Sequence, residues 1–314
     1  MDFNRSASEK TAAFTLYRST GLNTPVFMDS PHSGRDYSLF NGYLTLDEKI
    51  AAYSEDRWVD LLLADLPAKG ADVLLANFPR DLIDPNRSIR QISADQFLDL
   101  DKKKFITRPN DGHVRAGYGL IAVTVRDHFQ RAHTMYNGKL PQSELERRLS
   151  NFYNPYHEKL EEIIAIKRAL HGACYHINCH SMQNWAAPKL NGRHVDFEIG
   201  YQSRDTGEKT ACDNLVGEIT VHLQLAGFTV AVNKCFKGGQ IVSVHGDPEN
   251  GVHSIQLEIN RLLYMDEETL DYDPKRAHRV ISALEGINST IMAFHTAPEP
   301  AIGRTPHIAT YMRR

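Results

Sequence analysis

Short apolar runs alternate with longer amphipathic stretches along this chain. The apolar runs predict buried strands over residues 25–28, 71–76, 173–177, 229–232 and 254–259. The stretches between several of them place apolar residues at helical spacing, which predicts helices over 46–66 (capped by Thr45), 142–170, 209–225 and 275–294. Strands that alternate with helices indicate an α/β fold, in which a mixed, largely parallel sheet carries helices on both faces. No repeat or linker interrupts the pattern, so we expect one domain over residues 1–314.

Composition excludes several classes of protein. The chain is 41% hydrophobic and 24% charged, as is ordinary for a globular protein, and its formal net charge of -3 argues against nucleic acid as a partner. No apolar run approaches the roughly 18 residues of a membrane span, and the N-terminal segment MDFNRSASEK lacks the apolar core of a signal peptide. We therefore expect a cytoplasmic protein without membrane contact. Its oligomeric state stays open, with a homodimer the commonest arrangement.

The cysteines are few and scattered. Cys174, Cys179, Cys212 and Cys235 form no CxxC pair. A chain of this length needs no disulfide framework, and the spacing does not suggest a structural zinc site. We expect buried free thiols.

Irregular segments rich in Gly, Pro, Asn, Asp, Arg and His occupy residues 79–91, 101–119, 183–206 and 236–252. Several of them follow a predicted strand, and open α/β sheets bind ligands beyond the carboxyl ends of their strands. His32, in SPHSG, lies at one such end, and His180, in NCHSM, lies at another.

These two histidines are candidate metal ligands. Imidazoles presented by rigid strands suit zinc, although a catalytic zinc ion generally needs a third protein ligand, commonly a carboxylate. Glu55 and Asp56, on the predicted helix over 46–66, offer one. The alternatives are a turn histidine held by local hydrogen bonds and an acidic pair on a solvated helix face.

The segment FPRDLIDPNRSIR brings arginines into a loop after the strand over 71–76, together with Asp84 and Asn86. The arginines are Arg80, Arg87 and Arg90. Because guanidinium binds carboxylate through two parallel hydrogen bonds, this loop is a candidate clamp for an anionic substrate. A surface cluster of salt bridges is the alternative.

Glu258 lies within an apolar strand. Strand alternation places Gln256 and Glu258 on one face, with Leu257 and Ile259 on the other. A buried glutamate is costly unless it is paired, metal-bound or catalytic, and burial raises its pKa toward the range of a general base. An ion pair with Arg261 or another arginine is the structural alternative.

Taken together, these segments resemble the N-formylglutamate amidohydrolase (deformylase) family, which has a fold akin to zinc carboxypeptidases. The matching motifs stand in the family's order and cover most of the chain. They are SPHSG at 30–34, SEDRWVD at 54–60, FPRDLIDPNRS at 78–88, NCHSM at 178–182, FKGGQIVSVHGDP at 236–248 and HSIQLEINRLLYMDE at 253–267.

The resemblance assigns a role to most of the candidate residues. It implies a zinc ion, or another divalent metal, held by His32, His180 and a carboxylate that we place at Asp56, with Glu55 as the alternative. Glu258 matches the base that acts on the metal-bound water. The implied substrate-binding residues are Asn86, Arg87 and Arg90 in the arginine-rich loop, Lys237 in FKGG, and His245.

Two positions depart from related sequences. Zinc carboxypeptidases take their carboxylate three residues after the first histidine, where this chain has Arg35. Many family members have an aspartate two residues before the second histidine, where this chain has Asn178. Asparagine still forms hydrogen bonds but supplies no charge, so the affinity for metal is expected to differ.

The resemblance implies a hydrolase that cleaves N-formyl-L-glutamate, a small anionic N-acyl amino acid, in histidine catabolism. An N-acyl amino acid deacylase of other specificity and a carboxypeptidase-like peptidase are the enzymatic alternatives. A peptidase needs an open groove, whereas the loops over 101–119 and 183–206 could enclose a small substrate. A non-catalytic carboxylate-binding protein is the remaining alternative.

Overall fold

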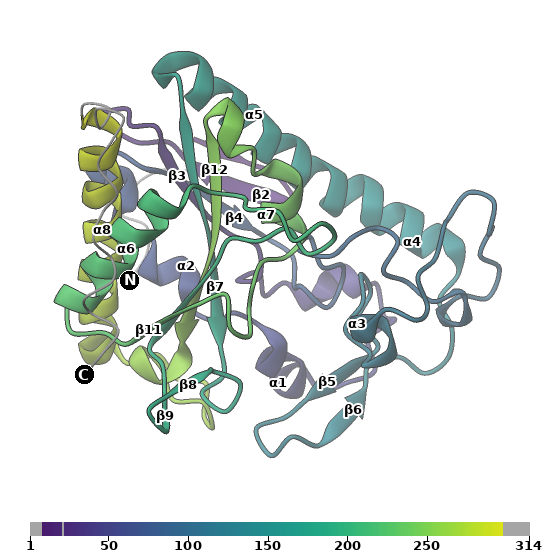
Figure 1. Ribbon diagram of the computed structural model, residues 1–314. Coiled ribbons are helices and arrows are strands. Elements are labelled where there is room, and N and C mark those ends of the chain that lie inside the picture. The colour runs from purple at the N-terminus through teal and green to yellow at the C-terminus, as the bar shows by residue number, and fades with distance from the viewer. Residues whose placement is uncertain (1–7, 21, 298–314) are drawn as a thin grey trace.

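The computed structural model describes residues 8–20 and 22–297, and a mixed eight-stranded sheet forms its centre (Figure 1). Residues 1–7, part of the segment MDFNRSASEK in which we expect no signal peptide, lie outside the described ranges. In sheet order, the strands are β1 (Glu9–Lys10), β2 (Phe14–Tyr17), β4 (Asp72–Ala76), β3 (Val26–Ser30), β7 (Cys174–Met182), β12 (Val252–Asn260), β10 (Phe197–Gly200) and β11 (Val230–Val232). The neighbours β4, β3, β7 and β12 are mutually parallel, whereas β2 and β10 run antiparallel to their central neighbours.

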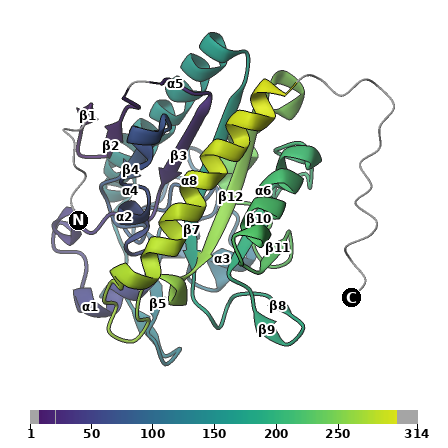
Figure 2. The ribbon, with the colours of Figure 1, turned by 90° about the vertical axis from the view of Figure 1, so that its left-hand side faces the viewer.

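Helices cover both faces of the sheet. One face packs against α2 (Val59–Leu62), α6 (Asp213–Leu225) and α8 (Pro274–Thr296), and Figure 2 shows α6 and α8 lying across it. The other face packs against α4 (Gln142–Arg148), α5 (Asn154–His171) and α7 (Gln240–His245). The fold is therefore of the α/β class that the sequence predicts.

Alternation along the central strands separates the core from a polar face. Ile177 and Cys179 of β7, with Leu257 of β12, point into the core formed with α6 and α8. The residues between them are polar and buried: His176, Asn178 and His180 in β7, and Ser254, Gln256 and Glu258 in β12. Because burying unpaired polar groups costs free energy, such a face is expected to be hydrogen-bonded or functional.

Most predicted elements are present with shifted ends. The helix predicted over 142–170 is continuous, with a π-helical turn at Leu149–Tyr153 between α4 and α5. The helix predicted over 209–225 begins only at Asp213. Strand β7 continues to Met182, so His180 lies inside a strand and not beyond its end. The pattern of apolar residues did not predict the short strands β2 and β10.

The prediction of one continuous helix over residues 46–66 is wrong. The chain forms α1 (Glu48–Ala51), a 3-10 turn at Ala52–Ser54 and then α2, with an extended residue at Glu55 and a left-handed Trp58 (φ 70°) between the helical pieces. Asp47, not Thr45, caps the first piece. This interruption determines the direction of Asp56, as described below.

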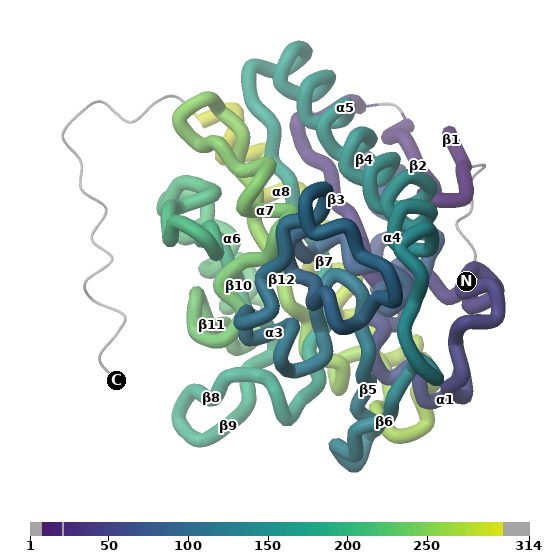
Figure 3. Tube along the Cα trace, turned by 90° about the vertical axis from the view of Figure 1, so that its right-hand side faces the viewer, coloured from purple at the N-terminus to yellow at the C-terminus, as the bar shows by residue number. Residues whose placement is uncertain are grey.

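The remaining elements lie in the connections. They are α3 (Gly112–Arg115), the hairpin of β5 (Thr124–Arg126) and β6 (Ala132–Thr134), and the hairpin of β8 (Lys189–Leu190) and β9 (Arg193–His194). Figure 3 shows the segment that carries α3 in front of the sheet, between α4 and β10. No helix among the described residues combines the length and apolar character that crossing a membrane requires.

The cysteines match the expectation of buried free thiols only in part. All are free, and Cys174 and Cys179 are buried, but Cys212 is half-buried and Cys235 is exposed. Cys235 follows β11, in the loop that leads to Lys237, which explains its exposure.

Candidate active site

The carboxyl ends of the parallel strands bring the candidate residues together. His32 follows β3 by two residues, and the arginine-rich loop follows β4. His180 and Glu258 occupy paired positions near the ends of β7 and β12. Because parallel strands end at the same edge, residues more than two hundred positions apart in the sequence share one site.

Asp56 reaches this site through the interruption between α1 and α2. Its backbone N–H donates to His32 O at 3.0 Å, and its main-chain oxygen accepts from Ser33 Oγ at 3.2 Å. The Glu55 carboxylate instead binds Tyr37 and Arg57. Of the two acids left open by the sequence, the structure therefore brings Asp56 to the histidines.

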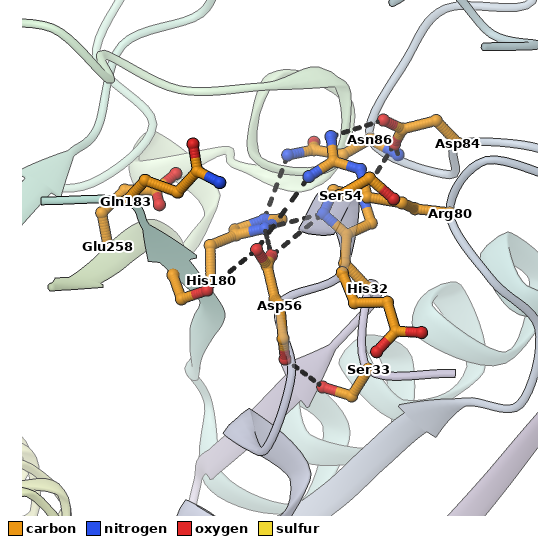
Figure 4. A network of polar contacts seen from close by, with 12 residues as sticks. His32, Ser33, Ser54, Asp56, Arg80, Asp84, Asn86, His180, Gln183 and Glu258 are labelled. Atoms are coloured by element: carbon orange, nitrogen blue, oxygen red, sulfur yellow. Dashed lines mark hydrogen bonds and ion pairs between the residues drawn. The ribbon is translucent and has the colours of Figure 1, made fainter. Parts of the chain in front are cut away.

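His32, Asp56 and His180 form a buried triad (Figure 4). Asp56 Oδ2 lies 3.1 Å from His32 Nδ1 and 2.9 Å from His180 Nδ1, and the two Nδ1 atoms are 3.1 Å apart. One potential ligand atom from each residue lies within 4.8 Å of the others.

Hydrogen bonds on the outer side orient both imidazoles. His32 Nε2 lies 2.7 Å from Asp84 Oδ1, and His180 Nε2 lies 2.6 Å from Asn178 Oδ1. The Asn178 amide is itself fixed, because its Nδ2 donates to Asp29 Oδ1 at 2.8 Å. With Nε2 of each ring directed at an outer oxygen, Nδ1 of each ring faces Asp56 Oδ2 inside the triad and is the atom that a metal ion would take.

This donor set fits a divalent metal ion. Two imidazole lone pairs and a carboxylate oxygen that face one another at about 3 Å repel unless a cation or a proton lies among them. Imidazole and carboxylate together suit zinc and similar ions, and outer partners such as Asp84 and Asn178 are the usual means of orienting ligating histidines.

Electrostatics within the triad favour charge separation. Burial alone would raise the pKa of Asp56, but its hydrogen bonds and electrostatic interactions with His180 and His32 hold that pKa well below its usual range. Burial lowers the pKa of His180 and so favours its neutral form. The triad therefore presents an ionised carboxylate beside a neutral imidazole, which are the protonation states that metal ligands require.

Glu258 lies beside the triad in a different environment. Burial, together with the negative charge of Asp56, raises its pKa to about 8. Glu258 accepts a hydrogen bond from Gln256 Nε2 at 2.8 Å, and it forms no ion pair with Arg261 among the described residues. Arg261 instead binds Ser181 and the backbone near Glu55, and no other arginine forms an ion pair with Glu258 within 4 Å in the described part of the chain. The ion-pair alternative for Glu258 is therefore wrong.

A cavity of about 310 Å³ adjoins these groups. It is lined by His32, Asp56, Arg80, Asn86, Arg87, His113, His180, Ser181, Arg204, Cys235, Phe236, Lys237, Gly238, Gly239, Gln256 and Glu258. Its size is near the lower limit of small-molecule sites, which commonly measure about 300 to 1,000 Å³.

The structure places two predicted substrate-binding residues away from this cavity. Arg90 is exposed on the arginine-rich loop and is not among the lining residues. His245 is buried on α7, where its Nε2 lies 3.3 Å from His157 Nδ1. It does not line the cavity either. Arg35 contacts Asp60 and stacks on Trp58, with its guanidinium carbon 4.4 Å from the ring centre.

Asn86 lies in the cavity wall with most of its hydrogen-bonding capacity used. Its Oδ1 accepts from Ile241 N–H at 2.9 Å, and its Nδ2 lies 3.3 Å from Gln256 Oε1 and 3.1 Å from His180 Nε2. A Cβ at Gly239 would overlap this amide, so this glycine permits close approach to Asn86. Asn86 therefore links the arginine-rich loop to the FKGG loop.

The sequence did not identify several residues of the site. His113 and Arg204 line the cavity from the irregular segments over 101–119 and 183–206. Their place in the site follows from a contact between residues far apart in the sequence, which no local motif indicates. Glu198 is a buried acid in the missed strand β10, and its Oε1 accepts from the N–H groups of residues 234–236. Such a carboxylate anchors the segment that leads into the FKGG loop.

A buried titratable cluster in a cavity at the carboxyl edge of an α/β sheet is typical of an enzyme's active site. The model of the N-formylglutamate amidohydrolase family matches residues 24–265. The chain belongs to this family and is a hydrolase that acts on an amide bond.

Individual relatives agree with the family match. N-formylglutamate deformylases from Pseudomonas aeruginosa and Pseudomonas putida are 27% identical over 248 and 249 residues, which cover 78% and 77% of this chain and 83% and 82% of theirs. The crystal structure of N-formylglutamate amidohydrolase from Ralstonia eutropha JMP134 is similar with a TM-score of 0.79 and 31% identity. The match covers 91% of this chain and 100% of that one.

Proposed function

We propose that this enzyme hydrolyses N-formyl-L-glutamate, or a similar N-acyl dicarboxylic amino acid, to release formate and the free amino acid. The observation that carries the proposal is one cavity that adjoins the buried triad, Glu258 and Arg87. The names of the relatives support the formyl group and glutamate as the two halves of the substrate.

The proposal includes a divalent metal ion, with zinc as the first choice, held by His32, Asp56 and His180. The geometry of these donors supports it, since both Nδ1 lone pairs and Asp56 Oδ2 point to one place. When bound there, such an ion would polarise the scissile carbonyl and lower the pKa of a water molecule toward neutrality.

Glu258 is the proposed general base and acid. It takes a proton from the attacking water and passes it to the nitrogen of the leaving amino acid. Its pKa of about 8 reflects burial beside the charge of Asp56, and positive charge at the triad would lower this value toward that of an effective base.

Two arginines have separate proposed tasks. Arg80 lines the cavity while its Nη2 is held by Asp84 Oδ2 at 2.8 Å, so its guanidinium can stabilise negative charge that develops on the carbonyl oxygen. Arg87 uses Nε and Nη1 to bind the main-chain oxygens of Tyr118 and Asn86, which holds it rigidly at the cavity wall. We assign Arg87 to the substrate's α-carboxylate, which places the amide beside the triad.

The size of the cavity, about 310 Å³, favours a small substrate over a peptide. Arg108 Nη1 lies 3.2 Å from Asp205 Oδ1, and this ion pair joins the loops over 101–119 and 183–206. A carboxypeptidase-like peptidase would need an open groove in this region. The N-acyl amino acid deacylase alternative differs in the acyl group or the amino acid of the substrate, and an assay of several substrates separates it from the proposal.

The test is formate release from N-formyl-L-glutamate by the purified protein as isolated, after chelation, and after zinc is added back. We expect activity that chelation abolishes and zinc restores. A panel of N-acetyl and N-formyl amino acids defines the acyl preference. Metal binding without formate release would overturn the substrate assignment, and full activity after complete metal removal would overturn the metal assignment.

A further inference from the structure

The cavity that adjoins the triad is also lined by basic side chains that have few ion-pair partners. These are Arg87, Arg204 and Lys237. Among the described residues, Arg87 and Lys237 form no ion pair within 4 Å, and the one acid near Arg204 is Asp111, whose Oδ2 lies 3.6 Å from Arg204 Nη2. Clustered, incompletely neutralised cations in a cavity indicate an anionic ligand.

The neighbours of Arg204 hold it in place without neutralising it fully. Its Nη1 lies 3.4 Å from His113 Nε2, and its main-chain N–H donates to Ser243 Oγ at 3.0 Å. Burial, with the charges of Arg87 and Arg204, lowers the pKa of His113 to about 3, so this imidazole is neutral and accepts from the guanidinium. The Arg204 side chain is 34% exposed, so it lies at the mouth of the cavity.

Arg87 and Arg204 occupy different positions relative to the triad. Arg87 follows Asn86, whose Nδ2 is 3.1 Å from His180 Nε2, so Arg87 belongs to the wall beside the triad. Arg204 comes from the turn after β10 and contacts the loop that carries α3. An N-acyl acidic amino acid matches this order, because its α-carboxylate is next to the scissile amide and its side-chain carboxylate lies further along the molecule.

We infer that Arg204 binds the side-chain carboxylate of the substrate and thereby makes the enzyme selective for acidic amino acids. This inference rests on the proposed function. His113 and Asp111 orient the guanidinium, while Arg87 holds the α-carboxylate that every N-acyl amino acid shares. Arg204 is therefore a specificity-determining residue, whereas Arg87 serves all substrates of the class.

The experiment compares N-formyl-L-glutamate with N-formyl-L-glutamine, its neutral isostere, for the wild type and for Arg204→Gln. We expect Arg204→Gln to lower kcat/KM for the glutamate substrate by about 10- to 100-fold, as loss of a charged hydrogen-bonded pair predicts. The ratio of the two kcat/KM values should fall by about tenfold or more, mostly through KM. Arg204→Lys keeps the charge and should retain part of the selectivity.

Two further variants separate this role from general effects. Arg87→Gln should lower kcat/KM for both substrates alike. Arg193→Gln removes an equal charge from the exposed strand β9, outside the cavity lining, and should behave as wild type. Thermal unfolding of Arg204→Gln should match that of wild type, because its side chain is partly exposed and makes only long polar contacts.

The outcomes distinguish the inference from the proposed function. If wild type hydrolyses N-formyl-L-glutamate but Arg204→Gln keeps the wild-type ratio between the two substrates, the inference is wrong and the proposed function stands. If wild type releases formate from neither substrate, the proposed function fails and the inference falls with it. If the ratio of kcat/KM for N-formyl-L-glutamate to that for N-formyl-L-glutamine falls in Arg204→Gln but not in Arg87→Gln or Arg193→Gln, the result supports both the inference and the proposed function.

Discussion

Glu258→Gln should separate the catalytic cost of Glu258 from its cost to stability. The variant keeps the size of the side chain, and its amide oxygen can still accept from Gln256 Nε2 at the present 2.8 Å. The fold should therefore persist. Loss of a general base lowers kcat by about 10²- to 10⁴-fold, while KM should change little because Arg87 is untouched.

The stability effect follows from the raised pKa. Burial and the charge of Asp56 raise the pKa of Glu258 from 4.5 to about 8, so the folded state binds this proton more tightly than the unfolded chain does. The contribution of Glu258 to the stability of the folded protein is therefore most favourable below pH 4.5, where Glu258 is protonated in both the folded and the unfolded state. This stability is lost as the pH rises from 4.5 through about 8. Relative to a side chain that does not titrate, Glu258 therefore costs the metal-free protein about 4 kcal/mol of stability near pH 7.5 but only about 1 kcal/mol near pH 5.

Removing the titrating group should therefore stabilise the metal-free protein. We expect the free energy of unfolding of Glu258→Gln, relative to wild type, to increase by about 3 kcal/mol between roughly pH 5 and pH 7.5. The measurement is urea denaturation in the presence of a chelator at both pH values. Glu249→Gln, a change at an exposed position, is the matched control and should show no such dependence.

Two results would refute this reasoning. A pH-independent difference between wild type and Glu258→Gln would show that Glu258 ionises in the folded state as it does in water. Turnover of the variant within about tenfold of wild type would contradict its role as the base. The two readouts are independent, since one uses metal-free protein and the other the active enzyme.

Further substitutions test the groups that support the site. Asn178→Asp should destabilise the protein by about 3 kcal/mol at neutral pH and less near pH 5, because the Asp29 carboxylate lies 2.8 Å from the position of the new carboxylate; urea denaturation at the two pH values measures this. Gly239→Ala should raise KM and cost about 1–3 kcal/mol of stability, since the added Cβ displaces the Asn86 amide; steady-state kinetics and thermal unfolding check both effects. Glu198→Ala should cost about 3–5 kcal/mol in denaturation experiments, because three backbone N–H groups lose their buried acceptor.

Alternation and strand ends made part of the site predictable from the sequence. The period of two in β12 placed Gln256 and Glu258 on one face, and both line the cavity. The rule that parallel strands present ligands at their carboxyl ends brought His32 and His180 together. These inferences succeeded because they depend on backbone periodicity, which local sequence determines.

Contacts between loops were beyond the reach of the same reasoning. His113 and Arg204 are 91 residues apart, and no period or motif relates their two segments. Strand β10 was missed because it is short and carries Glu198, whose burial is stabilised only by N–H groups more than thirty residues away. Arg90 looked equivalent to Arg87 in the sequence, yet the turn after Ser88 directs it to solvent.

The error in the first predicted helix shows how the triad is assembled. Apolar spacing over 46–66 favours a continuous helix, and a continuous helix would leave Asp56 with an i→i-4 backbone hydrogen bond. Instead its N–H bonds to His32 O at 3.0 Å, so the first histidine and the carboxylate are joined through the backbone as well as through their side chains. Tyr37 and Arg57 bind the buried Glu55 carboxylate and so stabilise the interruption. The chain thus gives up helical hydrogen bonds at Glu55–Trp58, and in return the position of Asp56 relative to His32 is fixed by main-chain geometry and not by side-chain rotamers alone.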